Sequence, residues 1–111
     1  MKTLFILVTI LLPQILLGQS SLNVTLLDNW QDPQLISNSS EIKYNDCWGY
    51  VQNDIEYAIL GTTEGTHVFE IKDDNTFKFI DFVEGKFSST SVIHRDLKVY
   101  KNYLYSVCDE G

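Results

Sequence analysis

The stretch that most constrains the fold is residues 56–71, where two runs rich in β-branched and aromatic residues flank a polar turn containing Gly65. This arrangement is typical of a β-hairpin. The first half of the stretch returns at residues 103–111, and Tyr57 and its counterpart Tyr103 are separated by 46 residues. A hairpin that recurs along the chain predicts a fold built from copies of one β-unit.

Downstream of residue 42 the sequence predicts short strands and no helix. Apolar and polar residues alternate over short runs that are bounded by turn-forming residues. A unit of four strands that recurs at this spacing is typical of a propeller blade, whose repeats have roughly 40–50 residues. We therefore expect an all-β fold, an incomplete β-propeller of about one and a half four-stranded antiparallel blades. The expected strands are 48–51, 57–62, 66–71, 77–83, 96–100 and 103–108.

The repeat region, residues 42–111, is long enough for about one and a half blades. A propeller closes with typically 4–8 blades, and repeat units gain stability mainly from their neighbours. We therefore expect this region to be a partial propeller, truncated at its C-terminus. The alternatives are a small complete β-sandwich and a non-functional remnant that does not fold stably.

The N-terminus, residues 1–18, has the composition of a secretory signal peptide. Lys2 supplies a positive charge, residues 4–12 form an apolar run broken only by Thr9, and Gly18 provides a small residue at the cleavage site. Pro13 interrupts the apolar run, which is shorter than the ~20 residues that a membrane-spanning helix needs. We predict export with cleavage, no membrane insertion afterwards, and a secreted or cell-surface location.

Residues 19–41 contain few periodic apolar positions and are expected to form an N-terminal segment or linker, with residues 22–26 as a candidate short strand. The whole chain carries a formal net charge of −7. This charge disfavours binding to nucleic acid and to anionic membranes, because both partners are negatively charged.

The two cysteines, Cys47 and Cys108, both fall in β-type runs. An oxidising compartment permits a disulfide between them, and closing a loop of about 60 residues would contribute ~4 kcal/mol. The alternative is that each is a small buried hydrophobic residue. Neither a CxxC spacing nor a histidine pair accompanies them, so we expect no zinc or other metal site.

Two segments carry a resemblance to a known family. Residues 45–50 have the pattern NDxWGY and residues 94–100 the pattern HRDxKxY. Together with the hairpin at 57–71 they resemble the N-terminal part of the choice-of-anchor B family, secreted bacterial proteins with LVIVD-type repeats. The resemblance covers about residues 42–111 and implies an exported β-propeller held at the cell surface, with no catalytic residue and no cofactor to transfer. The turn at 72–76 departs from the family because it lacks the usual prolines.

Five residues are candidates for a binding site or for a polar lock between blades: Asp46, Trp48, His94, Arg95 and Asp96. At the 46-residue spacing Trp48 and His94 are equivalent, each at the start of a unit's first strand. These strands line the central channel of a propeller, so the side chains could converge on a protein or carbohydrate ligand of unknown identity. We favour the structural alternative, in which Arg95 forms an ion pair with Asp96 or Asp46.

A catalytic role finds less support in the sequence. His94, Asp96 and the nearby serines supply the residue types of a catalytic triad, but no nucleophile elbow accompanies them. We therefore expect a non-enzymatic binding or scaffolding module, with a channel-located hydrolase or lyase completed by missing blades as the alternative. His67 alternates with Phe69 and Ile71 on one strand face and is predicted to be a packed core histidine.

Overall fold

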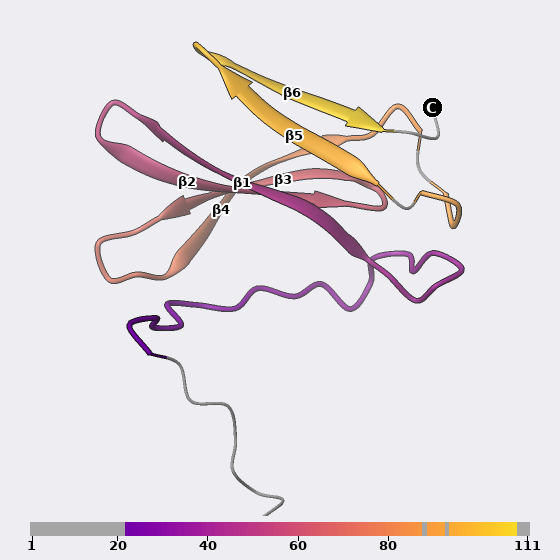
Figure 1. The fold of residues 1–111 in the computed structure, drawn as a ribbon, viewed down its shortest axis with the longest axis horizontal. Coiled ribbons are helices and arrows are strands. Elements are labelled where there is room, and N and C mark those ends of the chain that lie inside the picture. Colours follow the sequence, from indigo (N-terminus) through magenta and orange to yellow (C-terminus); the bar gives the residue numbers. More distant parts are fainter. Residues whose placement is uncertain (1–21, 88, 93, 109–111) are drawn as a thin grey trace, which may run out of the picture.

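The computed structural model describes residues 22–87, 89–92 and 94–108, and this part of the chain forms two antiparallel sheets and no helix. The predicted signal peptide lies outside the described residues. The first four strands form one sheet in the order β1-β2-β3-β4, and the last two form a separate hairpin (Figure 1). The prediction of an all-β fold is therefore confirmed. The strands are β1 (Tyr44–Gln52), β2 (Ile55–Thr62), β3 (Gly65–Ile71), β4 (Phe77–Glu84), β5 (Arg95–Tyr100) and β6 (Tyr103–Cys108).

Each predicted strand is present, and the largest difference lies at the start of β1. That strand begins at Tyr44 rather than at residue 48, and its register with β2 shifts between Tyr44 and Cys47. Such a bulge interrupts the alternation from which a strand is predicted, because an extra residue resets which side chains share a face. The candidate strand at 22–26 is wrong, since these residues have no strand conformation.

A second bulge, on β4, gathers aromatic rings on one face of the four-stranded sheet. Val68 pairs with Asp81 but Phe69 pairs with Phe79, so Ile80 is the extra residue on β4. Without it Phe79 and Phe82 would point to opposite faces, because side chains alternate along a strand. We call this side of the sheet the aromatic face; the rings in contact on it are those of His67, Phe69, Phe77, Phe79 and Phe82.

The N-terminal segment, residues 22–43, runs along the aromatic face. Its Trp30 ring lies 4.8 Å from the His67 ring and 4.9 Å from the Phe69 ring, measured between centroids. Asp28 Oδ2 accepts a hydrogen bond from the backbone N of Phe77 at 2.8 Å. The segment predicted to be a linker therefore supplies a packing residue, although its sequence has no strand or helix period.

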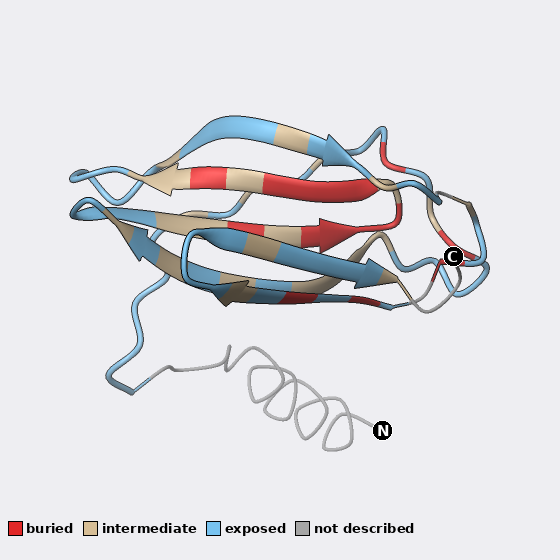
Figure 2. Cartoon of the chain, turned by 90° about the horizontal axis from the view of Figure 1, so that it is seen from above, coloured by how far each residue is buried: buried red, intermediate tan, exposed pale blue. Residues whose placement is uncertain are grey.

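The β5–β6 hairpin covers the opposite side, which we call the hairpin face of the sheet. β5 lies against β1 and β2, and the hairpin is drawn above the sheet while the N-terminal segment passes below it (Figure 1). Thr66 on β3 and Ser106 on β6 share a hydrogen bond of 3.0 Å between their hydroxyl groups. The four-stranded sheet is thus the middle of three layers. Its buried residues gather where β2 leads into β3 (Figure 2).

Candidate functional site

Four of the five predicted site residues line one hollow, at the end of the molecule where β1 and β5 begin. This polar hollow has a volume of about 360 Å³ and contains Asp46, His94, Arg95 and Asp96 among its lining residues. Trp48 lies elsewhere, with the Nζ atom of Lys98 4.1 Å from the centre of its ring. That contact is a cation–π interaction between β1 and β5.

Arg95 is a structural residue that joins the two sheets. Its side chain is buried, with 5% of the residue exposed. Nε donates to the carbonyl oxygen of Thr62 at 3.0 Å, and Nη2 donates to that of Phe87 at 3.4 Å. These carbonyls belong to the end of β2 and to the loop after β4. A planar guanidinium with several donors suits such acceptors, because one side chain can satisfy more than one of them.

Asp46 joins the same two sheets through its side chain on β1, which binds the backbone of β5. Its Oδ2 atom accepts a hydrogen bond from the backbone N of Leu97 at 2.9 Å, and Oδ1 accepts one from the backbone N of Cys47 at 2.8 Å. The predicted ion pair of Arg95 with Asp46 or Asp96 is therefore wrong. Within the described part of the chain the ion pair is Lys78–Glu70 at 2.9 Å. Both Asp46 and Arg95 bind backbone groups of the neighbouring sheet, and we call this pair the β1–β5 joint.

The turn between β2 and β3 holds the acceptor of this joint in place. The Thr62 hydroxyl accepts a hydrogen bond from the backbone N of Gly65 at 3.2 Å, a local bond typical of Thr in turns. Thr63 donates from its hydroxyl to the carbonyl of Ile36 in the N-terminal segment at 2.6 Å. The turn is therefore bonded to all three layers of the molecule.

His94 and Asp96 remain on the rim of the polar hollow with exposed side chains. Among the described residues, which include Ser89 and Ser91, neither side chain makes a hydrogen bond that would build a triad. A general base needs such a bond to its nucleophile and to an orienting group. Ser88, the other serine named for that role, lies outside the described residues.

The predicted equivalence of Trp48 with His94 is wrong, because the offset between the two repeats in the structure is 48 residues and not 46. The first hairpin closes with the pair Gln52↔Ile55 and the second with Tyr100↔Tyr103, which are 48 residues apart. In this register Trp48 corresponds to Asp96. The 46-residue spacing follows matching side chains, whereas the strand pairing is set by the two-residue turns.

Cys47 and Cys108 are both free thiols, so the disulfide that the sequence permits is not formed. Asp46 and Trp48 contact β5, and Cys47 lies between them on β1, so its side chain points to the aromatic face. Cys108 lies on the hairpin side, where it lines a hollow with Arg95. A bridge would have to pass through the sheet. The alternative prediction, a buried hydrophobic role, is wrong for Cys47, which is exposed.

His67 is the packed core histidine that the sequence predicts. Only 6% of the residue is exposed, and its ring centroid lies 4.5 Å from that of Phe82. Its Nδ1 atom is buried and makes no hydrogen bond within the described structure. Burial lowers the pKa of His67 below its ordinary value of 6.5, although the charges of Asp32 and Glu64 act in the opposite direction. The ring is therefore neutral at physiological pH.

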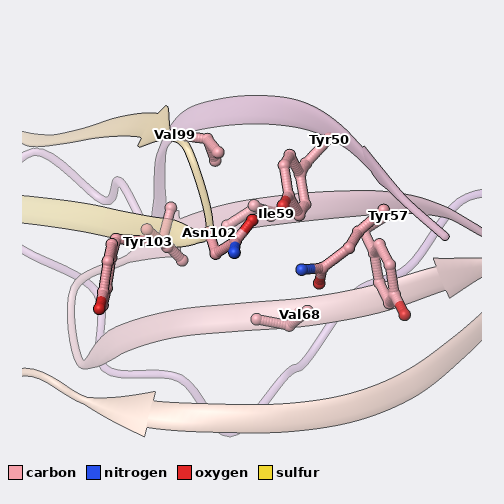
Figure 3. A pocket seen from close by; sticks show the side chains of 9 residues that line it. Tyr50, Tyr57, Ile59, Val68, Val99, Asn102 and Tyr103 are labelled. Atoms are coloured by element: carbon pink, nitrogen blue, oxygen red, sulfur yellow. The ribbon is translucent and has the colours of Figure 1, made fainter.

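Sequence reasoning missed a second cavity, which lies between the sheets near the tip of the β5–β6 hairpin. This tyrosine pocket has a volume of about 280 Å³, and Figure 3 shows Tyr50, Asn102 and Tyr103 around it. The signal in the sequence was the tyrosine that recurs in the repeated hairpin, Tyr57 and Tyr103. Only the stacking of the two sheets brings these residues together. The full lining is Tyr50, Gln52, Tyr57, Ile59, Val68, Val99, Asn102, Tyr103 and Leu104.

In the part of the chain that the structure describes, three or more potential metal ligands do not cluster at any point, and no helix is of the length and hydropathy that crossing a membrane requires. No family model, no curated protein and no solved structure matches the chain. The resemblance to the choice-of-anchor B family therefore stays a prediction, and the function is argued from geometry.

Proposed function

We propose that this chain is a non-enzymatic module of stacked β-sheets, a secreted or cell-surface repeat of the β-propeller type that serves in binding or scaffolding. One observation carries the proposal. In the 48-residue register, Tyr57 and Ile59 on the hairpin face correspond to Tyr105 and Val107 on β6. The hairpin face is covered by the next sheet, whereas the corresponding outer face of the β5–β6 hairpin is open.

Burial shows the contrast between these equivalent positions. Ile59 is 3% exposed beneath the hairpin, whereas Val107 is 61% exposed. The pairs Lys98↔Tyr105 and Asp96↔Val107 place these side chains on one face of the hairpin, since directly paired residues share a face. The face carries Asp96 and Lys98 beside three exposed aromatic or apolar side chains, those of Tyr103, Tyr105 and Val107. Exposed side chains of the latter kind in one patch mark an interaction surface. The hairpin face of the first sheet packs against the β5–β6 hairpin. Because the unit repeats, we infer that the outer face of β5–β6 packs against a further sheet in the same way.

The β1–β5 joint supports a structural rather than a catalytic role for the predicted site. A channel-located hydrolase or lyase would have used His94, Arg95 and Asp96, and of these Arg95 is occupied by backbone partners. Charge-assisted hydrogen bonds of this type position one sheet on another. The secreted location rests on the sequence of residues 1–18 and is part of the proposal.

Analytical ultracentrifugation of the protein over a concentration series tests the stacking role. We expect reversible self-association through the outer face of β5–β6. Val107→Lys should abolish it, because it replaces an apolar contact with a charge that association would have to remove from water. Val51→Lys is the matched control, because Val51 is 62% exposed and lies on β1 away from the outer face. A wild-type protein that stays monomeric throughout, or equal loss in both variants, would contradict the proposal.

A further inference from the structure

The tyrosine pocket has flat aromatic walls and an apolar floor. The rings of Tyr50 and Tyr57 stack with centroids 6.3 Å apart and an angle of 29° between their planes. Ile59 forms a buried part of the lining, and Tyr103 contributes a third, exposed ring from β6. Aromatic side chains of this kind provide large rigid contact surfaces while their hydroxyl groups remain available to polar partners.

Two amide side chains, those of Gln52 and Asn102, complete the pocket. Within the described structure neither makes a hydrogen bond to the protein, so their donors and acceptors are available to a ligand. Each amide offers one carbonyl oxygen and an NH₂ group with two donors. A few convergent polar groups on an apolar lining are the usual composition of a small-molecule site.

The charge of the pocket restricts the ligand. None of its nine lining residues is charged, and the chain as a whole carries a formal net charge of −7. Phosphorylated and other anionic ligands are therefore disfavoured, because nothing in the lining compensates their charge. A cation would have no carboxylate partner inside the pocket. The lining selects a neutral molecule.

The structure holds one of the two amides in position. The Tyr50 hydroxyl donates a hydrogen bond of 3.3 Å to the carbonyl oxygen of Lys101, the residue before Asn102. Lys101 has φ 54°, a left-handed conformation that forms part of the tight turn between β5 and β6. The turn that carries Asn102 is thus tied to β1 across the pocket, which reduces the ordering required when a ligand binds.

We propose that the tyrosine pocket binds one pyranose ring of a neutral carbohydrate. The inference rests on the proposed binding role and names the site and ligand class for it. A pyranose has an apolar C–H face that can lie on a tyrosine ring, and its hydroxyl groups are both donors and acceptors. The amides of Gln52 and Asn102 can pair with such hydroxyls through both their O and N atoms. A volume of about 280 Å³ lies just below the 300–1,000 Å³ of drug-sized ligand sites, which suits a single ring.

Saturation-transfer difference NMR of the full chain tests this inference, with methyl β-D-glucopyranoside, methyl β-D-galactopyranoside and methyl N-acetyl-β-D-glucosaminide as probes. We expect saturation transfer to one face of the pyranose ring in at least one of the three. Asn102→Ala should weaken that binding by about fivefold, the equivalent of one hydrogen bond. Tyr103→Ala should weaken it as well. Gln34→Ala is the matched control, because Gln34 has an exposed amide side chain that neither lines the pocket nor lies on the outer face.

Absence of transfer to all three glycosides would overturn the inference, and so would binding that Asn102→Ala leaves unchanged. Binding of N-acetyl-tryptophanamide without any glycoside would overturn the ligand class. The proposed function has a separate readout, since self-association depends on Val107 and the sugar probes do not. If no sugar binds while Val107-dependent association persists, the assignment of the tyrosine pocket is wrong and the proposed stacking role stands.

Discussion

The buried guanidinium of Arg95 donates from Nε to the carbonyl oxygen of Thr62 at 3.0 Å, which connects the first strand of the hairpin to the end of β2. This bond joins two sheets that share no backbone ladder. The carbonyl and the guanidinium are both removed from water, so each needs the other as a partner.

Replacement of Arg95 should therefore destabilise the protein strongly. We expect Arg95→Ala to lower the free energy of unfolding by about 2–4 kcal/mol, because it removes the side-chain donor to the buried carbonyl of Thr62 and a packed side chain. Denaturant titration followed by circular dichroism measures the change. Lys86→Ala, an exposed substitution in the loop after β4, should shift stability by no more than about 0.5 kcal/mol. Equal effects of the two changes would show that the β1–β5 joint contributes little.

Two glycines provide a matched test of the packing between β3 and β4. A Cβ atom on Gly65 would collide with the carbonyl oxygen of Val83 and would lie 2.8 Å from the Phe82 ring, whereas one on Gly49 meets no atom within 4 Å. We expect Gly65→Ala to lower stability by about 3 kcal/mol through overpacking. Gly49→Ala should be neutral or stabilise by up to about 1 kcal/mol, because alanine restricts the unfolded chain. The midpoints of thermal unfolding compare them; a tolerated alanine at Gly65 would contradict the observed strand spacing.

The buried ring of His67 should make stability depend on pH. Because its pKa is lowered in the folded protein, the unfolded chain takes up the proton first as the pH falls below 6.5. This contribution is therefore fully favourable above that pH, and it is lost as the pH falls toward the lowered folded-state pKa. Unfolding free energies measured between pH 7.5 and pH 5 should decline, and His67→Phe should flatten the decline in this range. An unchanged slope in the variant would assign the dependence to other groups.

The positions of Cys47 and Cys108 predict that reducing agent leaves stability unaffected. Both thiols are free, and Cys47 is exposed. We expect equal melting temperatures with and without dithiothreitol, and rapid reaction of Cys47 with a thiol reagent in the native protein. Cys47→Ser should remove the rapid phase and Cys108→Ser should retain it. A melting temperature that falls on reduction would instead indicate a disulfide.

The sequence alone was sufficient to predict the strands, since their signals are local. Alternation and turn residues recur every few positions, and the predicted bounds of β6 match those observed. His67 was also predictable, because its strand neighbours Phe69 and Ile71 identify a buried face. Four of the five candidate site residues share the polar hollow, because β1 and β5 begin at the same end of the molecule.

Only the tertiary structure determined what those residues do. Arg95 binds carbonyls rather than a carboxylate, and Trp30 inserts among rings far along the chain. Cys47 and Cys108 lie on opposite sides of the four-stranded sheet. Each outcome depends on a bulge, a turn register or the stacking of separate layers. Such features move side chains between faces without changing the composition of any strand. Local propensity therefore determined the elements of this protein, and the packing of distant elements determined its contacts and its pocket.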